Sequence, residues 1–393
     1  MNEEILYKLW LNILCGHTPS IINKIVKNIG SAEEIYNSDE KYKKATSALP
    51  LSLRLRARRS LDKARELYEY CEREGIRILT IDDEKYPDSL REVYAPPQIL
   101  YIKGHEIDFN NLVCVSIVGS RHCSENGKKF IYNLSQDLAK AGVLIVSGMA
   151  MGADASAHRG AIKAGNMTVA VLAGGVDRVY PKENTSLYKE IVSYGAILSE
   201  RPPGSEGKGT YYRERNRIIT GLSKGVVIAE GELKSGTKLT ADWAINSNRD
   251  LYAVPGAPTE KGSELPNTLI KNSAKLITSA EDILEDYIAV YPKELKFGID
   301  LIDEERSLRD KAEKNIEYNR LDSLKKAEKP SFESFDENQR KVLEYLYDKG
   351  TEIHIDEISR DLSIDVTELS FIIIQLLMAR VIKEHPGEYY SIA

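Results

Sequence analysis

The chain has 393 residues, of which 42% are hydrophobic and 29% charged, a composition typical of folded globular proteins with two or three domains. Its net charge of −6 gives no general attraction to nucleic acid, so a DNA-binding surface would have to concentrate its basic groups in one place. No run of about 18 apolar residues occurs, and the acidic start is unlike a signal peptide. The four cysteines form no CxxC pair, which predicts reduced thiols in a cytoplasmic protein without a zinc site.

Residues 1–70 are predicted to form a small helical module, because apolar side chains such as Leu6, Leu9 and Ile13 recur at helical spacing. Gly30 followed by Ser31 and two glutamates predicts a helix end and the N-cap of the next helix. The module could be a SAM-like packing or protein-interaction domain, or a helix-hairpin-helix that touches DNA phosphates. Its turn at 15–19 lacks a Gly-x-Gly-like sequence, which favours the packing role.

Residues 71–290 are predicted to form a Rossmann-like, doubly wound α/β domain with an N-terminal extension. Its proline-rich start, 75–110, predicts a strand-and-turn connector that lies on a neighbouring domain. Beyond it, short β-branched runs separated by helical segments indicate a parallel sheet covered on both faces. The runs expected to be strands are Val113–Val118, Val143–Val146, Val169–Leu172, Ala196–Leu198, Val226–Ala229, Leu251–Val254 and Leu276–Thr278.

Two further segments follow the α/β domain. Residues 291–333 are rich in both signs of charge and poor in large apolar residues, which predicts a charged linker. Residues 334–393 regain a core pattern of three helices followed by two short strands, the order of a winged helix-turn-helix.

In an open α/β sheet, ligands bind at the carboxyl ends of the strands. Glycine- and serine-rich loops beginning at Gly119, Ser147, Ala173 and Glu230 follow four of the predicted strands and suggest a phosphate-lined surface. Ser124, after the first of these loops, is predicted to be the N-cap of the helix that follows. The chain contains no GxGxxG fingerprint, no P-loop and no HExxH motif, so neither a dinucleotide cofactor nor ATP hydrolysis is predicted. Asp154 and His158 are expected to be a helix-start carboxylate and a packed histidine, because two ligands do not make a metal site.

A basic and aromatic cluster occupies residues 208–217, with four basic residues, two tyrosines and an asparagine directly before an apolar helix. Basic groups follow phosphates and tyrosines stack on bases, which is the combination that a single-strand platform needs. A solvated charged turn explains the same composition, so the cluster alone leaves both interpretations open.

The ordered set of motifs over roughly 75–280 resembles the DNA-processing protein A (DprA/Smf) family. In chain order the motifs are SIVGSR at 116–121, SGMAMGADASAH at 147–158, AGGVDRVYPKEN at 173–184, SERP at 199–202, RNRIITGLS at 215–223, SGTKLTA at 235–241 and AVPG at 253–256. A helical N-terminal module and a winged-helix tail are also usual attachments in this family.

The resemblance implies a protein without enzymatic activity that binds single-stranded DNA without sequence specificity. It further implies a homodimer formed through the Rossmann-like domain, and loading of the RecA recombinase in natural transformation. Carried over by matched position, arginines and lysines would contact phosphates and the serine-glycine turn would offer donors. The implied DNA-binding residues are Gly119, Ser120, Arg121, Ser147, Gly148, Lys182, Tyr212, Arg215, Asn216, Arg217 and Lys238.

The sequence departs from the family pattern at three positions near this surface. Arg213 stands where the family has proline, Ala153 where a larger aliphatic is usual, and Lys238 where an aliphatic is usual. The alternative function is a nucleotide-binding enzyme of the nucleotide-monophosphate phosphoribohydrolase type. That class needs a PGGxGTxxE-like segment, whereas the corresponding strand here ends in Ala229-Glu230-Gly231-Glu232.

In the tail, fold and charge point to different partners. A winged helix suggests duplex DNA, yet residues 331–393 hold thirteen acidic and six basic residues, a net charge of −7. The third helix begins near Asp365 and Glu368, and its middle, Phe371–Ile374, is more apolar than one buried stripe requires. This pattern favours a protein partner or the dimer mate over duplex DNA.

Overall fold

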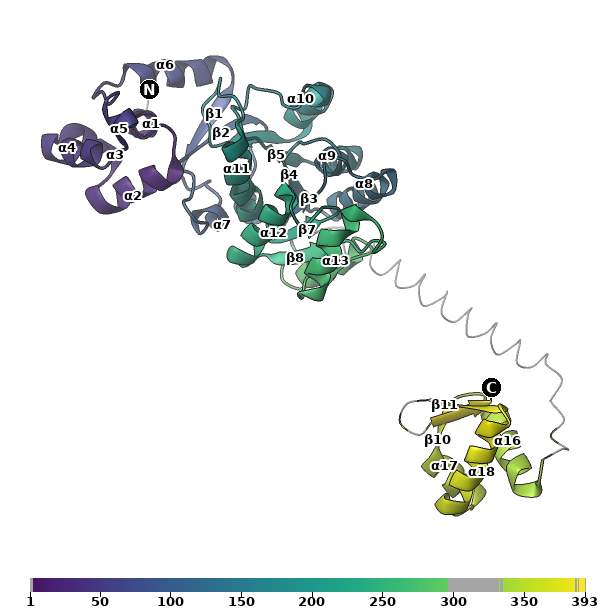
Figure 1. Cartoon of the computed structure of the whole chain (residues 1–393). Helices are drawn as coiled ribbons and strands as arrows, with labels where there is room; N and C mark the ends of the chain where they lie inside the picture. Colours follow the sequence, from purple (N-terminus) through teal and green to yellow (C-terminus); the bar gives the residue numbers. More distant parts are fainter. Residues whose placement is uncertain (1–2, 296–331, 333–334, 386, 388, 393) are drawn as a thin grey trace. The chain divides into compact units, whose positions relative to one another are not determined.

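The computed structural model describes residues 3–295, 332, 335–385, 387 and 389–392. The chain divides into two compact units, Met1–Asp303 and Glu304–Ala393 (Figure 1). Most of the predicted linker, 291–333, lies outside the described residues. No helix in the described part of the chain is long and apolar enough to cross a membrane.

The larger unit is built on one nine-stranded sheet. Its spatial order is β1-β2-β6-β5-β4-β3-β7-β8-β9, and the seven strands from β6 to β9 are mutually parallel. The strands are β1 (Ile76–Thr80), β2 (Ile99–Gly104), β3 (Cys114–Val118), β4 (Leu144–Ser147), β5 (Thr168–Val171), β6 (Ala196–Ser199), β7 (Gly225–Ile228), β8 (Asp250–Ala253) and β9 (Lys275–Leu276). The predicted Rossmann-like α/β fold is therefore confirmed.

The seven runs predicted to be strands of a parallel sheet are mutually parallel, but the sheet is extended at one edge by two antiparallel strands. The 75–110 segment, expected to be a connector on a neighbouring domain, supplies β1 and β2, which join the sheet antiparallel. Strand β2 pairs with β6 through Tyr101 and Ser199, so the extension belongs to the same sheet. The residue pattern of a segment identifies a β-strand but not the strand with which it pairs. The pairing of β2 with β6, about a hundred residues later in the chain, is set by tertiary packing.

Helices cover both faces of the sheet. Helices α8 and α9 pack with α14 on one face, while α7 and α11 pack on the other and share a core with β2, β4 and β6 (Figure 1). Ser124 is the N-cap of α8, as the sequence predicts, and its hydroxyl accepts from the Gly127 amide. The helices are α7 (Asp88–Arg91), α8 (Glu125–Lys140), α9 (Ala153–Lys163), α10 (Thr185–Tyr194), α11 (Gly209–Leu222), α12 (Gly236–Asn246), α13 (Glu264–Lys271) and α14 (Glu281–Ile288), with short 3-10 turns at Phe109–Asn111, Lys182–Asn184 and Lys261–Ser263.

The N-terminal helical module shares its core with the sheet. Buried Leu9, Trp10 and Ile22 belong to the same hydrophobic cluster as Tyr101 and Ile197. A capping box at Ser31 starts α3, which confirms the predicted N-cap. The module's helices are α1 (Glu3–Leu14), α2 (Pro19–Ile29), α3 (Ala32–Asn37), α4 (Asp39–Ser47), α5 (Leu51–Arg54) and α6 (Asp62–Arg73).

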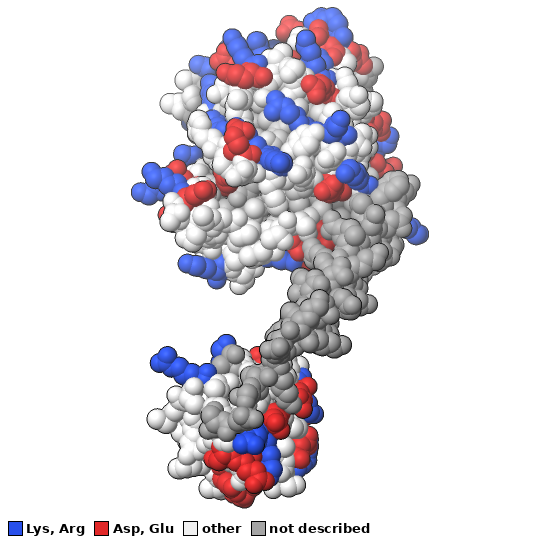
Figure 2. Space-filling model, turned by 90° about the vertical axis from the view of Figure 1, so that its right-hand side faces the viewer, with Lys and Arg blue, Asp and Glu red and all other residues white. Residues whose placement is uncertain are grey.

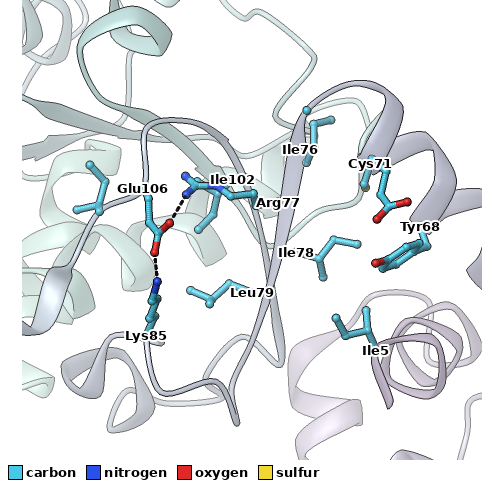
Figure 3. A pocket seen from close by; sticks show the side chains of 13 residues that line it. Ile5, Tyr68, Cys71, Ile76, Arg77, Ile78, Leu79, Lys85, Ile102 and Glu106 are labelled. Atoms are coloured by element: carbon cyan, nitrogen blue, oxygen red, sulfur yellow. Dashed lines mark hydrogen bonds and ion pairs between the residues drawn. The ribbon is translucent and has the colours of Figure 1, made fainter. Parts of the chain in front are cut away.

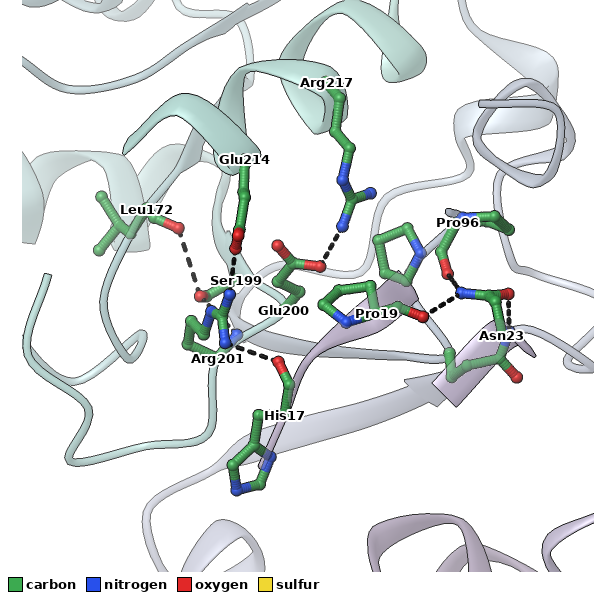
Figure 4. Close-up of polar contacts among 12 residues, drawn as sticks. His17, Pro19, Asn23, Pro96, Leu172, Ser199, Glu200, Arg201, Glu214 and Arg217 are labelled. Atoms are coloured by element: carbon green, nitrogen blue, oxygen red, sulfur yellow. Dashed lines mark hydrogen bonds and ion pairs between the residues drawn. The ribbon is translucent and has the colours of Figure 1, made fainter. Parts of the chain in front are cut away.

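Two ion pairs fix α11 to the loop after β6; the Arg217–Glu200 pair is buried on both sides, whereas the Glu214 side chain is 41% exposed. Arg217 pairs with Glu200 and Arg201 pairs with Glu214, and the two arginines are 3% and 4% exposed (Figure 4). Arg201 also donates to the backbone carbonyl of His17 at 2.6 Å, so it connects the helical module with α11. Burial raises the pKa of Glu200, and Arg217 opposes this shift.

We predict that Arg217→Met lowers the free energy of unfolding by about 3–5 kcal/mol, because it leaves Glu200 buried and unpaired. Replacing both residues by methionine should recover much of this loss. Lys238→Met is the matched control: Lys238 forms an exposed pair with Asp242, and such pairs contribute at most about 1 kcal/mol. Urea unfolding followed by tryptophan fluorescence measures the difference, since Trp10 and Trp243 both lie in the larger unit. Equal losses in Arg217→Met and Lys238→Met would contradict the prediction.

The smaller unit has its own hydrophobic core and the element order of a winged helix. Val342, Ile358, Ile373 and Tyr390 are among the side chains that form this core. Its sheet has the antiparallel order β10-β12-β11. The elements are α16 (Glu337–Lys349), β10 (Ile353–His354), α17 (Ile355–Leu362), α18 (Val366–Met378), β11 (Ile382–His385) and β12 (Tyr389–Ile392).

Candidate nucleic-acid interface

The carboxyl ends of β3, β4, β5 and β7 lie side by side and form the C-terminal edge of the parallel sheet, where the strands end. The chain winds from β3 towards β6 on one side and from β7 towards β9 on the other, so the topological switch point lies between β3 and β7. Two adjoining cavities of about 350 and 410 Å³ open at this edge and share Arg121, Ala150, Tyr212 and Arg215. We call the two cavities together the strand-end cleft.

Arg215 forms the floor of the strand-end cleft. Its side chain extends from α11 across the end of the sheet, where Nη1 donates to the Val171 carbonyl at 2.7 Å. This path runs over Gly148, where an added Cβ would lie 1.8 Å from Arg215 Nη1. The glycine after β4 is therefore required by the arginine above it. Burial lowers the pKa of Arg215, and the carboxylate of buried Asp154 opposes this shift.

An aromatic and cationic surface lies above this floor. The Tyr212 ring is 5.5 Å from the Arg121 guanidinium and 5.9 Å from the centroid of Tyr180. Tyr180 is 56% exposed, and Tyr212 is partly buried. One exposed ring beside a cation provides both a stacking face and a phosphate contact.

Three exposed cations line the cleft: Arg121, Lys182 and Arg213. None of them forms an ion pair with any residue that the structure describes. The carboxylates in the same lining are Asp154, Glu183 and Glu232. On the face of the larger unit shown in Figure 2, blue and red side chains are interspersed without a broad field of one sign. The three unpaired cations of the cleft are therefore a local concentration of positive charge in a chain with a net charge of −6.

The structure brings most of the sequence-predicted residues together. Those that line the strand-end cleft are Gly119, Ser120, Arg121, Gly148, Lys182, Tyr212, Arg215 and Asn216. Asn216 donates to Thr240 Oγ1 at 2.9 Å, which fixes the wall between α11 and α12.

Three predicted residues have other positions. Arg217 is buried against Glu200 on the side of α11 away from the cleft, so the prediction that it contacts phosphate does not fit its geometry. Lys238 pairs with Asp242 at 2.9 Å and lines a separate cavity beside Arg249. The Ser147 hydroxyl is wholly buried and donates to the Ile117 carbonyl at 2.6 Å, so it is not available to a ligand.

Two side chains of the cleft were missed by sequence reasoning. Arg213 was counted in the basic cluster and noted as a departure from the family pattern, and Tyr180 was quoted as part of a motif, but neither was named as a DNA-binding residue. Both contained a usable signal, since Arg213 lies in the basic cluster and Tyr180 follows β5 at the carboxyl edge. What the sequence could not show is that Tyr180 and Tyr212, thirty-two positions apart, have neighbouring rings.

Asp154 and His158 have the structural roles expected for them. Asp154 is 3% exposed and accepts from the Ala150 amide at 3.3 Å near the start of α9. His158 is fully buried, its Nδ1 is 2.8 Å from Thr168 Oγ1, and burial lowers its pKa to about 3. Within the described ranges, no three His, Cys, Asp or Glu residues are placed to hold a metal ion.

Glu230, at the end of β7, is held by the start of α8. Its carboxylate accepts from the Ser124 amide at 2.9 Å and from the Ser124 hydroxyl at 2.5 Å. An added Cβ at Gly127 would lie 2.1 Å from Glu230 Oε1, so the carboxylate fits directly against the helix. Glu230 is thus a helix-capping group in this fold.

Comparison with known proteins gives the family. Residues 77–288, more than half of the chain, match the family described as DNA recombination-mediator protein A. The chain belongs to this family. It is 38% identical over 213 residues to the DNA processing protein DprA of Bacillus subtilis, covering 54% of this chain and 72% of that protein.

Solved structures agree with this family membership. The X-ray structure of DNA processing protein A from Streptococcus pneumoniae superposes with a TM-score of 0.58 at 32% identity, covering 72% of this chain and 98% of that one. A second structure is described as giving insight into the single-stranded DNA binding mode of DNA processing protein A from Helicobacter pylori. It has a TM-score of 0.50 and 27% identity, and covers 55% of this chain and 97% of that one. The recombination-mediator family thus accounts for the Rossmann-like unit that holds the cleft.

Proposed function

We propose that this protein binds single-stranded DNA in the strand-end cleft, without sequence specificity. The observation that carries the proposal is the set of three exposed, unpaired cations, Arg121, Lys182 and Arg213, beside the Tyr180 and Tyr212 rings. Cations follow the phosphates of any sequence, and an exposed ring stacks on any base. The single-stranded DNA binding described for the Helicobacter pylori relative supports this assignment.

We predict that Arg121→Glu weakens binding to all single-stranded sequences alike and reduces the dependence of affinity on salt. Each lost phosphate contact removes about one released counterion, so the slope of log K against log salt should fall by about 1 or more. Fluorescence anisotropy with labelled oligonucleotides of several sequences, at several salt concentrations, measures both effects. Lys182→Glu and Arg213→Glu should behave in the same way.

Lys238→Glu is the matched control, because Lys238 is also a half-exposed cation of this unit but pairs with Asp242 outside the cleft. It should leave affinity nearly unchanged. If Lys238→Glu weakens binding as much as Arg121→Glu does, the DNA follows a different surface. Arg217 is unsuitable for this comparison, because its substitution disturbs a buried ion pair.

We further propose that the protein loads RecA recombinase on single strands during natural transformation, and that it acts in the cytoplasm. The family description, a recombination mediator, supports this role. The test is whether the protein accelerates RecA assembly on single strands, and whether Arg121→Glu removes the acceleration.

We also propose a homodimer through the Rossmann-like unit. Leu276 on the edge strand β9 and Ile245 on α12 are 47% and 60% exposed, which supports an apolar contact there; sedimentation of Leu276→Glu tests it.

We propose a binding protein without enzymatic turnover. The alternative, a phosphoribohydrolase-like enzyme, needs a PGGxGTxxE-like segment with a catalytic glutamate. The corresponding strand here ends in Ala229-Glu230-Gly231-Glu232, and Glu230 caps α8 through Ser124.

For the tail, we predict no measurable binding of duplex DNA at moderate salt. The outer face of α18, which a winged helix would insert into the major groove, exposes Phe371, Ile374 and Met378 by 67%, 55% and 81%. Asp365 and Glu368 are exposed at its start, and the residues from 331 onward have a net charge of −7. Acidic groups opposite phosphates cost affinity and release no counterions.

The tail can be tested by itself because it forms a compact unit with its own hydrophobic core. Electrophoretic mobility shift with a duplex should show no complex for residues 331–393, and deletion of these residues should leave single-strand affinity nearly unchanged. A duplex complex that weakens steeply with salt would contradict this prediction.

A further inference from the structure

A second cavity of the larger unit lies at the open edge of the nine-stranded sheet, away from the strand-end cleft. It has a volume of about 530 Å³ and is lined by Ile76, Arg77, Ile78 and Leu79, four consecutive residues of β1 (Figure 3). Side chains of a strand alternate between its two faces. A cavity that touches all four residues therefore runs along the strand's edge. We call this cavity the edge groove.

The backbone of β1 presents free hydrogen-bonding groups to the edge groove. Ile81 donates its amide to the Gln98 carbonyl at 3.1 Å, and the antiparallel register places Leu79 opposite Leu100 and Arg77 opposite Ile102. Hydrogen-bonded pairs alternate along an antiparallel ladder, so residues 77, 79 and 81 bond to the β2 side. The amides and carbonyls of Ile76 and Ile78 therefore point outward.

The amide and carbonyl of Thr80, the next residue along β1 that points outward, already have hydrogen-bond partners. The Thr80 amide donates to Asp83 Oδ2 at 2.6 Å, and the Thr80 carbonyl accepts from the Asp83 amide at 3.0 Å. The open stretch of the edge thus ends at Thr80. An added strand would bond to Ile76 and Ile78, which fits an extended segment of about five residues.

The two walls of the groove differ in chemistry. One wall is mainly apolar and consists of Ile5 from α1 and Tyr68 from α6 beside Ile78 (Figure 3). It also holds the carboxylate of Glu72, whose interaction with the Tyr68 phenol raises the pKa of that phenol.

The opposite wall carries Arg77 and Lys85, which share the single carboxylate of Glu106. Lys85 is 71% exposed, so its ammonium group is accessible to a further anion. Among the residues that line the groove, this wall thus holds two cations and one carboxylate, while Asp108, outside the lining, also acts on Lys85.

We propose that the edge groove binds an extended peptide of a partner protein, in which apolar and acidic residues alternate, as a tenth strand of the sheet. Side chains of an added strand also alternate, so its apolar residues would contact Ile5 and Tyr68 while its acidic residues would meet Lys85 and Arg77. Main-chain hydrogen bonds to Ile76 and Ile78 would supply affinity for any extended chain, and the two walls would select the pattern.

A second copy of this chain fits the groove less well than a peptide. Strand β1 lies between the side chains of α6 on one side and Lys85 with Glu106 on the other (Figure 3). The β1 strand of a second copy reads Ile-Arg-Ile-Leu-Thr, with one basic and no acidic residue, so it does not complement the wall that carries Arg77 and Lys85.

The test uses the full-length protein and a fluorescein-labelled synthetic peptide, Gly-Ile-Glu-Ile-Glu-Ile-Gly, with binding measured by anisotropy. We expect saturable binding that a peptide with lysine in place of glutamate does not show. Methylating the backbone nitrogens on the bonding edge of the peptide should weaken binding about tenfold or more, because it removes main-chain donors and leaves the side chains unchanged.

Two variants of the protein probe the two halves of the proposal. Ile78→Pro removes an outward amide and leaves the ladder with β2 intact, since edge positions that face away from the sheet tolerate proline; it should abolish peptide binding while single-strand DNA affinity is retained. Lys85→Glu should reverse the preference towards the lysine peptide. Lys63→Glu, an exposed lysine of α6 outside the groove, is the matched control and should change nothing.

Equal binding of the glutamate and lysine peptides, or unchanged binding of the N-methylated peptide, would overturn the proposal even if Ile78→Pro fails to fold. A dimer of the wild type that dissociates in Ile78→Pro would assign the groove to a second copy and would also overturn it. The outcome is independent of DNA binding, because no residue of the edge groove lines the strand-end cleft.

Discussion

Helix α11 carries charged side chains on two faces. Those on one face are neutralised by ion pairs within the protein, and those on the other lie in the strand-end cleft, where a ligand can bind. Arg217 and Glu214 are neutralised by Glu200 and Arg201, which come from the loop after β6. Because the Arg217–Glu200 pair is buried, it costs desolvation energy that only good mutual geometry offsets. Together the two pairs fix the helix in a rotation that directs Tyr212 and Arg215 into the strand-end cleft. The position of the cleft's floor thus depends on ion pairs that no ligand touches.

The same pairs couple the helical module to the cleft. Arg201 contacts Glu214 of α11, the Tyr211 ring at 3.8 Å and the His17 carbonyl of the module. The pKa of His17 is lowered to about 4 by burial and by Arg201, so its ring stays neutral near neutral pH beside that guanidinium. A module that was expected to be a separate packing domain is therefore part of the support of α11. Its contribution is structural, which agrees with the absence of a hairpin-like glycine turn at 15–19.

Sequence reasoning predicted what depends on local pattern. The seven parallel strands follow from short β-branched runs, and the N-caps at Ser31 and Ser124 follow from neighbouring residues. It could not tell Arg215 from Arg217, two positions apart. One lies in the cleft, and the other is neutralised by Glu200, a partner that only the tertiary fold brings to it. The predicted DNA contact of Lys238 does not fit the structure for a simpler reason, because Asp242, one helical turn away, already pairs with this lysine.

The capping of α8 by Glu230 has a consequence for how a Rossmann-like sheet is used. In dinucleotide-binding proteins, the helix after the first strand presents its N-terminus to a pyrophosphate. Here β3 and α8 occupy the corresponding positions, and the protein's own carboxylate already accepts from the Ser124 amide and hydroxyl there. An internal anion therefore takes the place of a cofactor's phosphate. A polyanion arriving at this edge has to bind through side-chain cations next to the helix terminus, which suits a long flexible strand better than a small nucleotide.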